Sequence, residues 1–211
     1  ISATGPVAHG VFVQNGVLID NLENECHSVA TQGEWPALQG AHNAQNVAAA
    51  SAAARLLGLS WKVIRQGLQS YQSLPHRMEP LGQLSQVAFY NDSKATNPDA
   101  AARAIMAFEK VHWIAGGIAK SEDLGALAGA TAHISKAYLI GESRETLKKS
   151  LQDRVAVDCF DGLDAAVQAA FRDAQETHGV VLLSPACASQ DQYRDFAERG
   201  EHFREIFSAL K

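Results

Sequence analysis

Downstream of Pro75, short apolar runs that suit buried strands alternate with longer stretches of helical character. This alternation predicts an α/β fold with a Rossmann-like, mostly parallel sheet and helices on both faces. Strands are expected at Gln86–Tyr90, Val111–Ala115, Lys136–Ile140, Val155–Val157 and Val180–Leu183. Helices are expected at Pro98–Glu109, Leu124–Thr131, Ser143–Leu151, Leu163–Thr177 and Gln190–Leu210.

The stretch before Pro75 has a different pattern. Asn15-Gly16 joins two β-prone runs, and this dipeptide favours a tight hairpin because both positions accept positive φ. Pro75 ends the last helix of this part, so we place a boundary between residues 1–74 and 75–211. The elements expected before it are a hairpin in Gly10–Asp20, a strand at His27–Thr31 and helices at Gly40–Gly58 and Ser60–Tyr71.

Charge and composition exclude several classes of protein. The 211 residues include 18 Lys and Arg against 23 Asp and Glu, without a basic block, so a nucleic-acid surface is not expected. No apolar stretch reaches the length of about 20 residues needed to cross a bilayer, so membrane insertion is not expected either. Cys26, Cys159 and Cys187 form no CxxC pair, which favours a reducing compartment and a cytoplasmic protein. No Cys or His spacing indicates a bound metal.

One loop, at residues 91–97, concentrates polar chemistry directly after an expected strand. Pro98 then suits the first turn of a helix. Asp92, Lys94 and Thr96 should therefore lie at the carboxyl end of a strand and face a helix N-terminus, where α/β sheets bind anionic ligands.

Two further loops follow strands. Gly116-Gly117 precedes Lys120 in the loop after a strand. The paired glycines would let the backbone approach a ligand closely, with Lys120 supplying a charge. A glycine turn followed by a surface lysine is the alternative, and it is the more frequent case. The loop at residues 184–189 has small side chains, and Ser189 is placed to cap the last helix and to offer a hydroxyl to a carboxylate. A buried, inert Cys187 is favoured over a nucleophile. Three loops at one sheet edge predict a cleft for a small anion.

The helix expected at Gly40–Gly58 opens with a polar cluster. A cap requires one Asn, so Asn43 as a cap with a solvated Asn46 is one interpretation. The alternative, less favoured on spacing alone, is that both face a ligand together with His42.

Five segments together resemble the Mur ligase family from Leu38 to Leu210, namely GAHNAQNVAAA, LPHRME, NDSKATNP, GGIAKSEDL and LLSPACASQDQYRDFAERGEHF. The resemblance implies an ATP-dependent, amide-forming ligase with ATP and Mg²⁺ as cofactors, which phosphorylates a substrate carboxylate before an amine attacks the acyl phosphate. The members that add D-glutamate to UDP-N-acetylmuramoyl-L-alanine in peptidoglycan synthesis are the most similar. Alternatives are folylpolyglutamate synthase, another Mur ligase, or a non-catalytic module that binds a nucleotide or amino acid.

The resemblance also implies which residues contact the nucleotide. Asn43 and Asn46 resemble adenine contacts, with His42 near the phosphates. Arg77 resembles an arginine that reaches a nucleotide phosphate, and Asp92 an aspartate that holds the ribose.

The remaining implied roles concern catalysis and D-glutamate. Lys94 would stabilise the closed site, and Lys120 would act in catalysis as well as binding. Thr96 and Lys120 resemble the pair that binds the α-carboxylate of D-glutamate. Ser189 and the backbone at Phe196 resemble the groups that bind the side-chain carboxylate of D-glutamate.

The family's phosphate loop, carboxylated lysine and main Mg²⁺ ligands have no counterpart in this sequence. Residues 1–74 are therefore interpreted as the tail of the central, ATP-binding domain and residues 75–211 as the C-terminal domain. We expect such a fragment to be inactive alone, and the full-length enzyme to be a monomer.

Overall fold

The computed structural model describes the chain except residues 4, 24, 36, 39–40, 73 and 121–124, and the side chains of residues 41–42. The chain divides into two compact units, Ile1–Ser73 and Leu74–Lys211, called unit 1 and unit 2 below. No helix among the described residues is long and apolar enough to cross a membrane.

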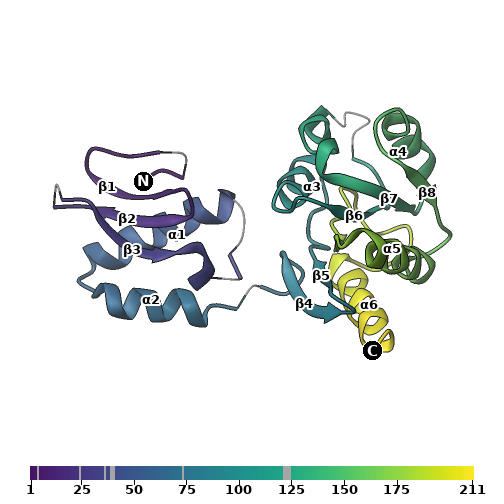
Figure 1. Cartoon of the computed structure of the whole chain (residues 1–211). Coiled ribbons are helices and arrows are strands. Elements are labelled where there is room, and N and C mark those ends of the chain that lie inside the picture. The colour runs from purple at the N-terminus through teal and green to yellow at the C-terminus, as the bar shows by residue number, and fades with distance from the viewer. Residues whose placement is uncertain (4, 24, 36, 39–40, 73, 121–124) are drawn as a thin grey trace. The chain divides into compact units, whose positions relative to one another are not determined.

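Unit 1 is a small antiparallel sheet with two helices (Figure 1). The expected hairpin is confirmed, with Asn15 and Gly16 at φ of 51° and 73° in its turn. Val11, Leu18 and Trp35 pack with Val47 and Ala48 in its core. The elements are β1 (Gly10–Gln14), β2 (Val17–Asn21), β3 (His27–Thr31), the 3-10 turn η1 (Gln32–Glu34), α1 (Ala41–Leu56) and α2 (Trp61–Ser70).

Unit 2 contains a six-stranded sheet in the order β4-β5-β9-β6-β7-β8. Neighbouring strands from β5 to β8 run parallel, so the predicted α/β class with a mostly parallel sheet is confirmed. The strand expected at Val155–Val157 begins two residues later, at Val157, which pairs with Ala137 of the neighbouring strand. The strands are β4 (Glu79–Leu84), β5 (Val87–Asn91), β6 (Val111–Gly116), β7 (Ile134–Ile140), β8 (Val157–Cys159) and β9 (Val180–Leu183).

Helices cover both faces of this sheet (Figure 1). Successive residues of β6 point to opposite faces, so Trp113 joins the core cluster that contains Ile105 of α3 and Leu147 of α4. Ile114 joins the cluster that contains Val167 of α5 and Phe203 of α6. The helices are α3 (Pro98–Ile105), α4 (Arg144–Leu151), α5 (Leu163–Thr177) and α6 (Phe196–Ala209).

The strand β4 is absent from the sequence prediction. It pairs antiparallel with β5 through a tight turn in which Ser85 and Gln86 have φ of 47° and 69°. Pro80 and Gly82 argue against a strand interior, but an edge strand with a bulge accommodates both. The bulge lies between these two residues, and Gly82 has a φ of 126°.

Two expected helices differ from the structure. Leu124 lies outside the described residues, and the rest of the expected Leu124–Thr131 helix consists of the short 3-10 segments η2 (Gly125–Gly129) and η3 (Thr131–His133). The last helix begins at Phe196 rather than Gln190, because Asp195 is its N-cap and accepts a bond from the Glu198 N–H at 2.9 Å. Ser189 therefore does not cap this helix.

Candidate functional site

The loops after β5 and β9 are bonded to each other at the carboxyl edge of the unit 2 sheet. These two strands are neighbours, so their following loops start side by side. The Asp92 N–H donates to the Leu183 carbonyl at 2.7 Å, and the Ser184 hydroxyl donates to the Asp92 carboxylate at 2.8 Å. Further along, the Ala186 N–H donates to the Ala95 carbonyl at 2.9 Å. The residue 91–97 loop is thus fixed along its length.

The loop after β6 joins the β9 loop from the other side. The Gly116 N–H donates to the Pro185 carbonyl at 2.9 Å. Ile118 and Ala188 then form an isolated antiparallel bridge, with two backbone bonds of 2.9 Å each. The predicted convergence of the three loops on one sheet edge is confirmed.

Asp92 is buried at the centre of this edge. One carboxylate oxygen accepts from the Met78 N–H at 3.1 Å and the other from Ser184. Burial raises the pKa of Asp92 to about 6, and these two hydrogen bonds and the nearby Arg77 charge oppose that rise in part. The Asp92 side chain therefore links the residue 91–97 loop to Met78 and to the loop after β9.

Lys94 and Phe196 come together although about a hundred residues separate them in sequence. The Lys94 ammonium lies 4.1 Å from the centroid of the Phe196 ring, a distance typical of a cation–π contact. Phe196 is the first residue of α6, and its carbonyl accepts from the Ser93 hydroxyl at 2.7 Å. Two predicted site residues, one from the loop after β5 and one from the start of α6, are thus adjacent.

The paired glycines have a structural explanation. Gly116 and Gly117 have φ of 126° and 123°. A Cβ atom would lie 1.9 Å from the Ile140 carbonyl oxygen at Gly116 and 2.0 Å from the Ala188 oxygen at Gly117. The close approach is therefore to backbone of the protein, which requires glycine at both positions. Lys120, three residues further on, is exposed. Thr96, in the residue 91–97 loop, is partly buried.

Ser189 carries a buried polar atom without a partner. Its side chain is 1% exposed, and among the described residues nothing hydrogen bonds to its hydroxyl oxygen. Burying a hydroxyl in this way costs free energy unless a ligand or water satisfies it. Ser189 therefore has the property expected of a ligand contact, although the expectation that it caps α6 is wrong.

Cys187 lies in the same loop but belongs to the core. It is 1% exposed, and burial raises its thiol pKa to about 11, so the thiolate is not available at neutral pH. The burial of this thiol expected from the sequence is confirmed, and its inertness remains a prediction.

We expect a thiol reagent such as Ellman's to modify exposed Cys26 rapidly in the native protein and to modify Cys187 only on unfolding. The time course, followed by intact and peptide mass spectrometry with and without denaturant, assigns each thiol. Rapid labelling of Cys187 under native conditions would contradict its assignment to packing.

Arg199 is a buried residue of this edge that the sequence analysis did not single out. Its side chain is 1% exposed and donates hydrogen bonds to Ser93, to Cys187 and to Gly116 at the end of β6. Helical spacing is the signal that could have found it, because Phe196, Phe203 and Ile206 lie on the same helix face.

The residues predicted to contact adenine lie in unit 1. Asn43 is the third residue of α1, so it lies inside the helix and not at its cap. The Asn46 amide nitrogen lies 3.5 Å from the Asn43 side-chain oxygen. The His42 side chain lies outside the described part of the structure. Arg77, in unit 2, is exposed.

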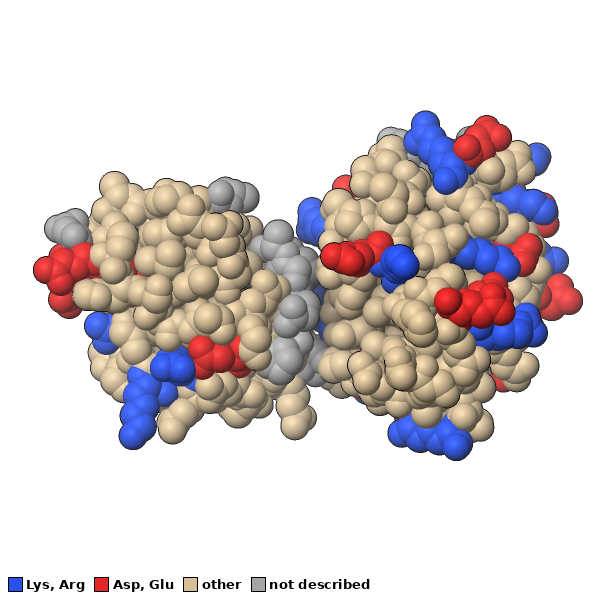
Figure 2. Space-filling view, viewed as in Figure 1, with Lys and Arg blue, Asp and Glu red and all other residues tan. Residues whose placement is uncertain are grey.

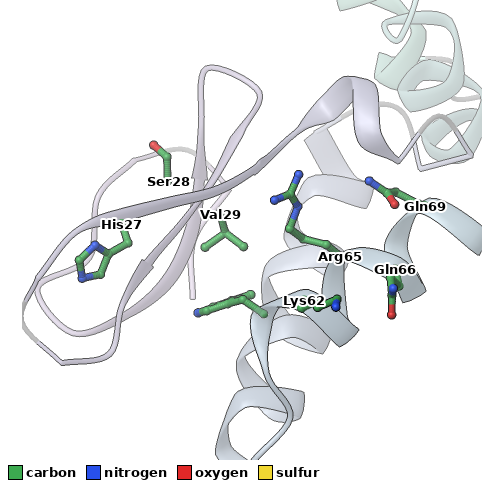
Figure 3. Close-up of a pocket in the computed structure, with 8 residues that line it drawn as sticks. His27, Ser28, Val29, Lys62, Arg65, Gln66 and Gln69 are labelled. Carbon is green, nitrogen blue, oxygen red and sulfur yellow. The ribbon is translucent and has the colours of Figure 1, made fainter.

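Unit 1 also has a cavity of about 460 Å³ between β3 and α2 (Figure 3). It contains none of the predicted site residues. Arg65 in its wall is neutralised by Glu34, whose carboxylate accepts from the guanidinium at 2.6 and 3.2 Å. The lining residues are His27, Ser28, Val29, Trp61, Lys62, Arg65, Gln66 and Gln69.

The mostly parallel sheet with three loops joined at its carboxyl edge is the arrangement at which α/β domains bind ligands. A family model described as "Mur ligase, glutamate ligase domain" matches residues 76–187, more than half of the chain. The chain therefore belongs to the Mur ligase family.

Similar proteins span the whole chain. UDP-N-acetylmuramoylalanine–D-glutamate ligases from Agrobacterium fabrum and Bradyrhizobium diazoefficiens are 48% and 46% identical to it over 100% of its length. This chain covers 46% of each, so it spans about half the length of the curated relatives it matches.

Solved structures agree in fold. Folylpolyglutamate synthase from Mycobacterium tuberculosis superposes with a TM-score of 0.62 at 19% identity, over 93% of this chain and 46% of the other. A UDP-N-acetylmuramate-alanine ligase from Thermotoga maritima gives 0.57 at 16% identity, over 82% and 39%. At these identities the likeness concerns the fold alone.

Proposed function

We propose that this chain is the carboxyl-terminal part of an ATP-dependent ligase that adds D-glutamate to UDP-N-acetylmuramoyl-L-alanine. Unit 2 binds the D-glutamate in this proposal. The observation that carries it is the buried, unpartnered Ser189 hydroxyl at an edge where three loops are bonded together. The similarity of the whole chain to D-glutamate ligases supports this choice of amino acid.

D-Glutamate has two carboxylates, and the loops offer separate groups for each. Thr96 and Lys120 bind the α-carboxylate, with Lys120 supplying the charge. Ser189 and the backbone N–H of Phe196 bind the side-chain carboxylate. The second grip is supported by its place at the start of α6, where the helix dipole favours an anion. Binding at both ends leaves the amine directed at the acceptor.

The amine attacks an acyl phosphate, displaces inorganic phosphate and loses a proton as the amide forms. The cationic side chains at this edge favour that step, because negative charge grows on the leaving phosphate. Lys120 does so from the D-glutamate side. Lys94, held over the Phe196 ring, stabilises the closed arrangement of the loops.

ATP, when bound, supplies the phosphoryl group. Asp92 fits a ribose contact only in part, because both of its oxygens already accept bonds within unit 2; each oxygen keeps a second lone pair. Arg77, exposed beside it, would reach a phosphate. His42, Asn43 and Asn46 are the proposed groups of unit 1, near the phosphates and at the adenine respectively. Among the described residues no three His, Cys, Asp or Glu side chains lie close enough together to hold a metal ion.

The partner of this site is therefore a small molecule in the cytoplasm. Basic and acidic side chains are interspersed over the face of unit 2 seen in Figure 2, without a continuous basic track for a nucleic acid. We also propose that the 211-residue chain alone does not form the amide, and that the complete enzyme is a monomer.

Lys120→Ala tests the D-glutamate site. A charge-assisted contact to a carboxylate contributes about 1.5–3 kcal/mol, so we expect the Kd for D-glutamate to rise about ten-fold or more. Kd is measured by a heteronuclear NMR titration of the 211-residue chain with D-glutamate, and with L-glutamate for comparison. Lys149→Ala, on the exposed side of α4, is the matched control and should leave Kd unchanged.

An unchanged Kd in Lys120→Ala would remove Lys120 from the site. Failure of the wild-type chain to bind D-glutamate in preference to its enantiomer would contradict the proposed function itself.

A further inference from the structure

All three guanidinium nitrogens of Arg199 donate hydrogen bonds to neutral acceptors. Its Nε donates to the Ser93 hydroxyl at 3.0 Å, and Nη2 donates to the Ser93 and Cys187 carbonyls at 2.9 and 3.2 Å. Nη1 donates to the Gly116 and Cys187 carbonyls, both at 3.3 Å. One side chain therefore joins the loops that follow β5 and β9 to the carboxyl end of β6.

In the described part of the chain, the guanidinium of Arg199 is buried without a carboxylate in direct contact. No carboxylate among the described residues forms an ion pair with it. Burial lowers the pKa of Arg199 to about 10, with Cys187, Asp191 and Tyr193 as the nearby titratable groups, so the side chain stays charged at neutral pH. Burial disfavours the charged guanidinium, and the nearby Asp191 carboxylate favours it without forming an ion pair, so a further anion close to Arg199 would be stabilised.

The surroundings of Arg199 indicate where that anion lies. The Ser93 hydroxyl that accepts from Arg199 donates in turn to the Phe196 carbonyl at 2.7 Å. The Cys187 carbonyl that accepts two of its bonds is two residues before Ser189. Arg199 is thus linked, through the Ser93 hydroxyl and the Cys187 carbonyl, to the segments that carry both groups proposed to grip the side-chain carboxylate.

We propose that Arg199 is a positioning residue that makes this edge specific for an amino acid with an anionic side chain. It braces the two gripping segments and keeps a positive charge next to them, without touching the ligand. The inference rests on the proposed D-glutamate site and adds the group that distinguishes a side-chain carboxylate from its uncharged isostere.

The test compares D-glutamate with D-glutamine, which differ in the charge of the side chain. Kd for each is measured by NMR titration of the 211-residue chain in three forms: wild type, Arg199→Lys and Arg199→Met. We expect the preference for D-glutamate to fall about ten-fold in Arg199→Met, which loses the charge, and less than about three-fold in Arg199→Lys, which keeps it. A purely structural role would weaken both ligands alike and leave the ratio unchanged.

Ser93→Ala keeps the test decisive if Arg199→Met does not fold. It removes the hydroxyl between Arg199 and Phe196 but leaves the buried charge in place. Thr177→Ala is the matched control, because it removes a hydroxyl bonded to His112 at 2.6 Å in another part of unit 2. We expect Ser93→Ala to weaken D-glutamate binding about three-fold or more and Thr177→Ala to leave it unchanged, with folding of both checked by circular dichroism.

The outcomes separate the two proposals. A wild-type preference for D-glutamate that persists in Arg199→Met overturns the role of Arg199 and leaves the D-glutamate site standing. Where Arg199→Met is unfolded, unchanged D-glutamate binding in Ser93→Ala does the same. A wild type without that preference overturns both.

Discussion

Gly117→Ala is expected to lower the free energy of unfolding of unit 2 by about 3 kcal/mol or more. A Cβ atom at this position would lie 2.0 Å from the Ala188 carbonyl oxygen and 3.3 Å from an Arg199 nitrogen. The first of these is a backbone atom held in the bridge to Ile118, so it cannot move without breaking that bridge. The φ of 123° adds strain for any residue with a side chain.

Urea denaturation followed by tryptophan fluorescence measures this loss, since Trp113 lies in the core of unit 2. Gly129→Ala is the matched control, because a Cβ there would meet no atom within 4 Å, and its effect should stay within about 0.5 kcal/mol. A Gly117→Ala variant as stable as wild type would show that the two loops separate easily.

Asp92→Asn is expected to stabilise unit 2 at pH 7.5 by about 1–3 kcal/mol. Burial raises the pKa of Asp92 from 3.8 to about 6, so folding favours the protonated carboxyl. The stability that this group contributes is fully present below pH 3.8 and is lost as the pH rises to about 6. Asparagine is neutral at every pH, and its amide can keep the bonds with Met78 and Ser184.

The measurement is the free energy of unfolding of both proteins from pH 4 to pH 8. The two curves should agree near pH 4 and separate as the pH rises, with the variant the more stable. Asp173→Asn should show the opposite trend, because hydrogen bonds from Lys136 and Tyr138 outweigh burial and lower the pKa of Asp173. Parallel curves for wild type and Asp92→Asn would contradict the raised pKa. An acid kept where it destabilises the fold is typical of a functional residue.

The elements that could be predicted from sequence are those whose pattern is local. Asn15-Gly16 determines a hairpin because few dipeptides accept positive φ twice in succession. Apolar runs such as VVLL at β9 indicate a strand buried on both faces, and Gly116 ends β6 where the backbone must turn. The convergence of the three loops then follows from parallel pairing alone.

The features that escaped prediction depend on distant partners. The Ser85-Gln86 turn has no glycine, so its residue types do not predict the hairpin that β4 forms with β5. The start of α6 was misplaced although Asp195 with Glu198 three residues later is a recognisable N-terminal signal. Arg199 resembles a surface arginine in sequence, and only the packing of α6 on the loops buries it.

The contacts of the site also determine when it can form during synthesis. Ser184 reaches back 92 residues to Asp92, and Arg199 reaches back 106 residues to Ser93. A chain still attached to the ribosome has therefore completed β5 long before it contains the residues that order the loop after it. Contacts between residues this far apart in sequence are slow to form. Before β9 has been synthesised, the hairpin of β4 and β5 is the local structure that β5 can form. The last helix is thus the segment that completes the hydrogen bonds among the chain segments of this sheet edge.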